Sequence, residues 1–140
     1  MPIFSSTSFE AGGLILTKLT REKIEESAVV VGPAKITLTG LDLRDLGDMS
    51  EIVLPGTMFN ETNLQNLDFT EAQLKGANFE SAKMNGATLK GAHLENTRFY
   101  RADLQKVNFE GAHLNEAYFG SAFLRAASFF KANLSNANFH

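Results

Sequence analysis

The sequence of 140 residues contains no cysteine, which excludes disulfide bonds and metal sites built from thiolates. It also has no apolar run that could cross a membrane, since a spanning helix needs about 20 such residues. The segment from Met1 to Phe4 places no positive charge ahead of an apolar stretch, so no secretory signal is predicted. These absences favour a single cytoplasmic domain with no membrane partner.

Most of the chain also has no excess of acidic or basic residues. Residues 57–140 hold eight acidic and eight basic side chains, and residues 1–56 account for the whole net charge of −3. A basic stripe is the usual electrostatic mark of a nucleic-acid-binding protein. We therefore expect no nucleic-acid partner.

The motifs of common catalytic sites are missing too. The sequence has no Gly-rich phosphate-binding loop and no arrangement typical of nucleophilic catalysis. The acidic residues that directly precede large apolar positions, Asp68 and Asp103, are not paired with a second acid in the way that acid–base chemistry requires. We expect no enzyme, no catalytic residue, no cofactor and no small-molecule substrate.

What the sequence does contain is a period of five. Every fifth residue from Phe59 to Phe139 is large and apolar, and the residue two positions earlier is alanine in twelve of seventeen units. A helix needs an apolar spacing of about 3.6 and a flat strand a spacing of 2, so neither fits. The period is typical of a solenoid whose short units share one interior. The predicted core consists of Phe59, Phe69, Phe79, Phe99, Phe109, Phe119, Phe129 and Phe139, together with Leu64, Leu74, Leu94, Leu104, Leu114, Leu124 and Leu134.

Phenylalanine and leucine alternate at the large positions, which adds a second period of ten. Like residues stack on like only if each turn holds an even number of units, and two units make a ring too tight for two phenyl groups. Four units per turn predict a four-sided coil of 20 residues, with neighbouring coils about 4.8 Å apart. Phe59, Phe79, Phe99, Phe119 and Phe139 should then form one column.

Several units share one pattern, alanine followed by Asp or Asn and then by Leu or Phe. Examples are Ala77-Asn78-Phe79, Ala102-Asp103-Leu104, Ala132-Asn133-Leu134 and Ala137-Asn138-Phe139. Over about 84 of 140 residues the sequence resembles the pentapeptide-repeat proteins. The resemblance implies an all-β solenoid, a right-handed quadrilateral parallel β-helix with four pentapeptides per coil and no catalytic pocket. The handedness comes from the resemblance alone.

The pattern divides the chain into two regions. Residues 36–140 form the predicted β-helix, which is degenerate over residues 36–56 and regular over residues 57–139, with a one-residue slip near Gly47 to Glu51. Residues 1–35 are predicted to be an N-terminal cap, because an open solenoid end exposes apolar core and unpaired backbone. A separate functional head is the alternative.

Within the cap, residues from Ile3 to Leu16 are expected to be degenerate or extended. Thr20 is a candidate N-cap for a short α-helix over residues 21–28. Val29 to Val31 should form a strand that ends at Gly32-Pro33.

At the other end, the pattern stops at Phe139 with no helix or charged tail after it. Either the last coil is covered by another copy, or the chain is a piece of a longer protein. A solenoid end invites pairing, so we expect a homodimer through the C-terminal coil.

His93 and His113 lie twenty residues apart, in a predicted column with Gln73 and Asn133. A metal ion needs at least a third strong ligand, and amides are poor ligands for zinc or copper. We interpret the column as a polar ladder on the outer surface and predict no metal site.

Four aromatic residues stand at outward positions of their units, where they could meet a partner. Aromatic and arginine side chains are the usual anchors of protein interfaces. The predicted partner-binding residues are Arg98, Tyr100, Arg101, Tyr118, Phe123, Arg125 and Phe130. The alternative is that some of the aromatic rings fold back over corners and pack locally.

These features favour a non-enzymatic protein-interaction scaffold with an unidentified protein partner. The resemblance also implies an alternative, a DNA mimic that binds DNA gyrase or topoisomerase IV, either inhibiting them or protecting them from quinolones. The balanced charge of residues 57–140 argues against mimicry of a phosphate backbone. A third hypothesis is a targeting or assembly domain of a larger protein.

Overall fold

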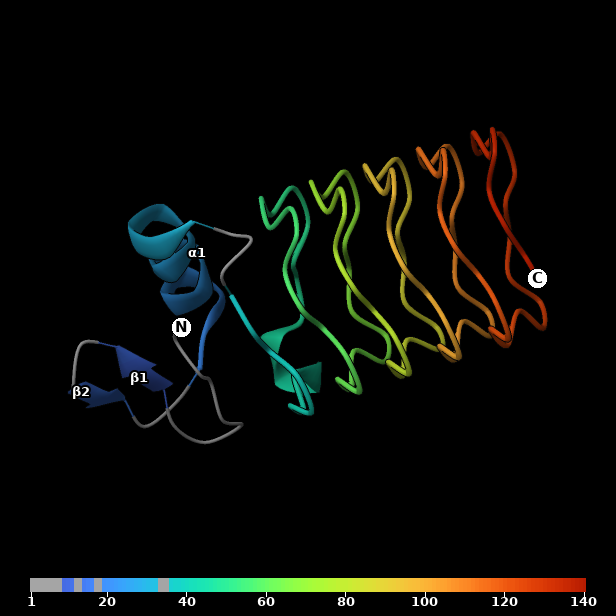
Figure 1. The fold of residues 1–140 in the computed structure, drawn as a ribbon. Helices are drawn as coiled ribbons and strands as arrows, with labels where there is room; N and C mark the ends of the chain where they lie inside the picture. Colours follow the sequence, from blue (N-terminus) through green and yellow to red (C-terminus); the bar gives the residue numbers. More distant parts are fainter. Residues whose placement is uncertain (1–8, 12–13, 17–18, 33–35) are drawn as a thin grey trace.

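The computed structural model describes residues 9–11, 14–16, 19–32 and 36–140 of the chain. A rod of stacked coils, coloured from cyan to red in Figure 1, forms the main body, and the named strands and helix gather at its N-terminal end. Strands β1 (Phe9–Ala11) and β2 (Leu14–Leu16) pair antiparallel. The expectations for Ile3 to Ser8 and for Pro33 lie outside the described residues.

Helix α1 (Arg21–Val31) begins after the predicted N-cap, Thr20, whose hydroxyl accepts a hydrogen bond from the N–H of Lys23 at 3.3 Å. The strand predicted at Val29–Val31 is wrong, because these residues form the last turn of α1. Gly32 ends the helix at φ 82°, and its N–H bonds the carbonyl of Ala28 at 3.0 Å. Valine in a helix costs only a few tenths of a kcal/mol relative to alanine. The preference of these valines for a strand is therefore outweighed, and the helix continues to its Gly32 cap.

Helix α1 lies against the first coils. Ile24 is fully buried in the shared core, and Arg21 donates hydrogen bonds to the carbonyls of Asp48 at 3.3 Å and Ser50 at 2.7 Å. The Arg21 guanidinium also pairs with Glu25 at 2.9 Å. The helix therefore covers part of the N-terminal end of the core.

From Thr37 onward the chain forms coils with four short faces and four corners. Parallel bridges join residues twenty positions apart, such as Asn78 with Arg98 and Arg98 with Tyr118. The N–H of each large inward residue donates to the next coil, as Phe79 does to the carbonyl of Arg98 at 2.8 Å. Each coil therefore holds four pentapeptides, as the alternation of Phe and Leu predicts.

The first coil contains one additional residue. Bridges before the 3₁₀ turn η2 (Arg44–Leu46) join residues 21 apart, such as Asp42 and Asn63, and bridges after it join residues 20 apart. The chain leaves η2 through Gly47 at φ 65°. The predicted slip is therefore present, but it begins earlier than Gly47 and is complete by the buried Met49.

The inward rings make two kinds of contact. Along the rod, Phe59, Phe79, Phe99, Phe119 and Phe139 form a parallel stack with centroids 4.7–5.4 Å apart and planes within 10°. Across the coils that hold two Phe residues, rings from opposite faces meet edge to face, as Phe99 and Phe109 do at 5.8 Å and 78°. Both are favourable aromatic geometries.

Burial follows the position along the rod. The predicted core residues from Phe59 to Phe119 are buried, whereas Leu124, Phe129 and Leu134 of the last coil are half-buried and Phe139 is 45% exposed. The inward side chains of the last described coil are therefore more accessible than those of the coils before it.

Each corner of the regular coils contains a residue with positive φ. These residues recur every five positions from Glu51 to Asn136, with φ between 56° and 75°. Glycine and asparagine tolerate this conformation, but for other residues it costs about 1–2 kcal/mol. Lys106 and Ala126 are among the positions with that cost.

We expect Lys106→Gly to leave the protein equally stable or more stable by up to about 1 kcal/mol, because glycine relieves the left-handed strain at φ 59°. Lys75→Gly is the matched control, since Lys75 is also exposed but is not among the positive-φ residues. There glycine should destabilise by about 0.5–1 kcal/mol. Calorimetric unfolding compares the two variants. If Lys75→Gly were more stable than Lys106→Gly, the assignment of strain to Lys106 would be contradicted.

Candidate functional site

The predicted aromatic surface divides into separate parts. Tyr118 lies on the same face as Arg98, Phe123 lies on the next face round the coil, and Phe130 lies at a corner beyond the face after that. The seven predicted residues therefore do not form one continuous patch.

Tyrosine and arginine form the first part. The rings of Tyr100 and Tyr118 stack with centroids 6.0 Å apart and planes at 21°. The guanidinium carbon of Arg101 lies 4.9 Å from the Tyr100 centroid, within cation–π range. Arg98 and Glu80 line a shallow surface recess together with the two tyrosines. The fold thus brings four predicted residues together, Arg98, Tyr100 and Arg101 from one coil and Tyr118 from the next.

Tyr118 also packs against its own corner. A Cβ at Gly120, which is buried, would clash with the phenol of Tyr118 and with the carbonyl of His140. The lack of a side chain at Gly120 therefore gives the ring room to fold back. For Tyr118, the local-packing alternative holds in part.

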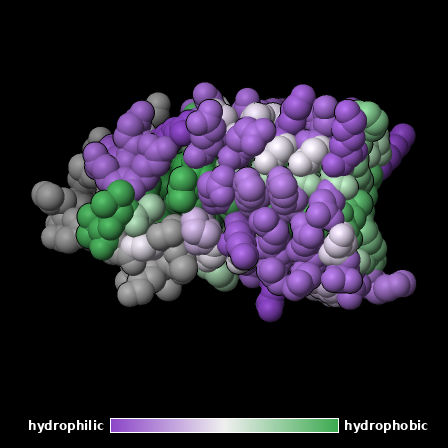
Figure 2. All heavy atoms as spheres, turned by 90° about the horizontal axis from the view of Figure 1, so that it is seen from above, coloured by the Kyte–Doolittle hydropathy of each residue, from purple (hydrophilic) through white to green (hydrophobic). Residues whose placement is uncertain are grey.

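Phe123 and Phe130 form the exposed part, with 60% and 62% of their surface accessible. Both belong to the last coil, as does the exposed Arg125. The ammonium of Lys131 lies 5.1 Å from the Phe130 centroid. Figure 2 shows hydrophobic atoms gathered at the C-terminal end of the rod, whereas hydrophilic residues cover most of the side in view. Exposed apolar atoms gathered at one end of a protein are typical of an interaction surface, whereas Phe123 and Phe130 themselves lie on different sides of the coil.

A second apolar surface, at the N-terminal end, has no counterpart in the sequence-based prediction. Val29, Val30 and Val53 are 87%, 81% and 57% exposed. Val29 and Val53 line a recess between α1 and the first coils, together with Glu25 and Glu51. The sequence predicts a strand at Val29–Val31, so it does not indicate that Val29 and Val30 lie on a helix beside the coils.

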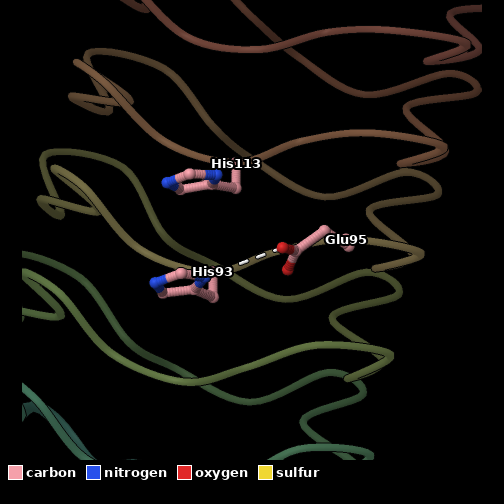
Figure 3. A group of neighbouring side chains, drawn as sticks. All are labelled: His93, Glu95 and His113. Atoms are coloured by element: carbon pink, nitrogen blue, oxygen red, sulfur yellow. Dashed lines mark ion pairs between the residues drawn. The ribbon is translucent and has the colours of Figure 1, made fainter.

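A third group is polar. His93 and His113 are bridge partners on neighbouring coils, and their rings stack at 4.5 Å with planes at 5°. Glu95 extends from the coil of His93, and its Oε1 lies 3.6 Å from Nδ1 of His93 (Figure 3). Potential ligand atoms of the three residues all lie within 4.8 Å of one another. Glu95 gave no signal in the sequence, since it does not share the twenty-residue column of the two histidines.

In the part of the chain that the structure describes, three carboxylates have clearly lowered pKa values, those of Glu22, Asp42 and Asp48. A hydrogen bond from the Arg44 side chain lowers the pKa of Asp42, and one from the Ser50 hydroxyl lowers the pKa of Asp48. Both are exposed groups of the first coil with local structural partners.

Among the described helices, none is long and apolar enough to span a membrane.

Comparison with known sequences identifies the repeat. The model of the family described as pentapeptide repeats matches residues 72–111 and 108–140, with eight copies. A comparison with curated proteins finds no match.

Solved structures reproduce the fold. A pentapeptide repeat protein from the Arabidopsis thaliana thylakoid lumen is 28% identical with a TM-score of 0.65, over 74% of this chain and 68% of that chain. Another (Rfr23), from the cyanobacterium Cyanothece 51142, is 16% identical with a TM-score of 0.71, over 85% and 95% of the two chains. A third, from Nostoc PCC 7120, is 18% identical with a TM-score of 0.55, over 86% and 96%. These similarities support the right-handed quadrilateral β-helix that the resemblance implies.

Proposed function

Because the chain belongs to the pentapeptide-repeat family, we propose that it is a non-enzymatic scaffold that binds another protein through fixed side chains on a rigid surface. The observation that carries the proposal is the exposure of the outward rings of Phe123 and Phe130, at 60% and 62%. Large aromatic side chains in this setting act as anchors when a partner buries them.

The closed interior supports this proposal. Phenylalanine, leucine and alanine side chains fill the described coils, so recognition falls to residues that point outward. The backbone ladder holds these outward residues at a fixed spacing along each face. A partner therefore meets a preorganised surface, which reduces the entropy lost on binding.

We place the contact around Phe123, with the tyrosine recess beside it. Phe123 lies on the face next to Tyr118, and Arg98 and Arg101 supply positive charge near the two tyrosines. An apolar anchor with arginine at its rim suits a protein partner whose surface combines an apolar pocket with acidic side chains. Such a surface would serve equally in a targeting or assembly domain.

No observation favours a DNA mimic. A rod that competes for a DNA-binding groove needs an excess of acidic groups, and residues 57–140 have equal numbers of acidic and basic side chains. The cytoplasmic location expected from the sequence stays a prediction.

We also propose that the last coil pairs with a second copy of the chain. Leu124, Phe129 and Leu134 are half-buried there, and Phe139 is 45% exposed. An end-to-end contact with two-fold symmetry would bury the same apolar surface on both copies. This contact uses the end of the coil and leaves the outward ring of Phe123 free for another partner.

Capture from a bacterial lysate tests the scaffold, with the wild type, Phe123→Glu and Lys83→Glu as baits. Lys83 is exposed on the same face as Phe123, two coils earlier, so it is the matched control. We expect one protein to be retained by the wild type and by Lys83→Glu, and to fall at least about tenfold on Phe123→Glu because a charge replaces the anchor. Equal capture by all three baits would contradict the proposal.

Sedimentation velocity tests the dimer separately. The wild type and Phe123→Glu should sediment as dimers at tens of micromolar, whereas Phe139→Glu should sediment as a monomer because a carboxylate cannot be buried unpaired at the end contact. A monomeric wild type at that concentration would rule out the end-to-end contact.

A further inference from the structure

We propose that His93, Glu95 and His113 form a surface site for a divalent transition-metal ion such as zinc. This site is independent of the proposed protein-interaction surface, since its histidines occupy a different face from Tyr118 and Phe123.

The ligand set suits this class of ion. Two imidazoles and one carboxylate are donors that zinc, copper and nickel accept, whereas magnesium and calcium prefer oxygen ligands alone. Gln73 and Asn133 continue the same column on either side of the histidines, and their amides are weak ligands. The three residues therefore supply a complete set of strong donors, with a fourth position open to water.

The distances permit a single shared ion. The potential ligand atoms lie within 4.8 Å of one another. Ligands 2.0–2.2 Å from a tetrahedral ion lie about 3.3 Å apart. Side-chain torsions alone can close that difference, since the χ2 angle of histidine has a broad range.

One ring must turn for the ion to bind. Figure 3 shows the two imidazoles stacked in parallel, so their lone pairs point in parallel planes instead of toward one point. The backbone need not move, because the parallel bridge between His93 and His113 already holds the two residues side by side. A site on such rigid elements needs only side-chain adjustment.

Glu95 provides the second, independent observation. Its Oε1 faces Nδ1 of His93 at 3.6 Å, and its Oε2 is buried with no hydrogen-bond partner. A buried carboxylate oxygen without a hydrogen-bond partner is unfavourable. Coordination of a cation by this carboxylate would remove that penalty.

Isothermal titration of zinc chloride into the untagged protein tests the site. We expect one zinc ion per chain in the wild type. His113→Asn should weaken binding at least about tenfold, because it leaves two strong ligands, and Glu95→Gln should weaken it as well because the negative donor is lost. His140→Asn is the matched control, since it removes a histidine outside the cluster and should bind zinc like the wild type.

A thermal melt of each variant without zinc checks that the fold is retained, and a melt with zinc gives a second readout. The ion should raise the melting temperature of the wild type and of His140→Asn, and raise it less in His113→Asn and Glu95→Gln. If the wild type binds zinc no more tightly than His113→Asn and Glu95→Gln do, the proposal is overturned. The three residues would then be only a polar ladder.

Discussion

The stacking of identical inward side chains from coil to coil is the constraint on which the rest of the structure depends. The Phe column repeats at 4.7–5.4 Å, close to the backbone spacing of paired strands. An inserted residue would move every later ring off its column, and the described coils contain one insertion only, at η2 before the Phe column begins. Outward positions carry no such restriction, so surface chemistry can vary on an unchanged core.

The fold could be predicted because this stacking constraint appears in the sequence as a five-residue repeat. Alternating Phe and Leu required a coil of 20 residues, but nothing in the residues themselves determined its handedness. The valines after Ala28 were misassigned because β propensity is weak against a helix that continues to its Gly32 cap. The sites were harder to predict. The folding of Tyr118 over Gly120 and the approach of Glu95 to His93 depend on side-chain direction at corners, which a linear spacing does not encode.

A rod with four faces places the proposed sites on different faces. The histidine cluster, the tyrosine recess and Phe123 follow one another round the coils, and the partly exposed inward side chains of the last described coil lie at the C-terminal end. Because the backbone ladder is continuous, occupation of one surface need not distort another. This arrangement suits a scaffold, in which position and spacing matter more than movement.

Urea unfolding of Phe99→Ala and Phe139→Ala tests the central claim most directly. Phe99 is fully buried between Phe79 and Phe119, whereas Phe139 ends the same column and is 45% exposed. Column stacking predicts a loss of about 3–5 kcal/mol for Phe99→Ala and a clearly smaller loss for Phe139→Ala. Equal losses, or a small loss at Phe99, would show that the column does not hold the coils together.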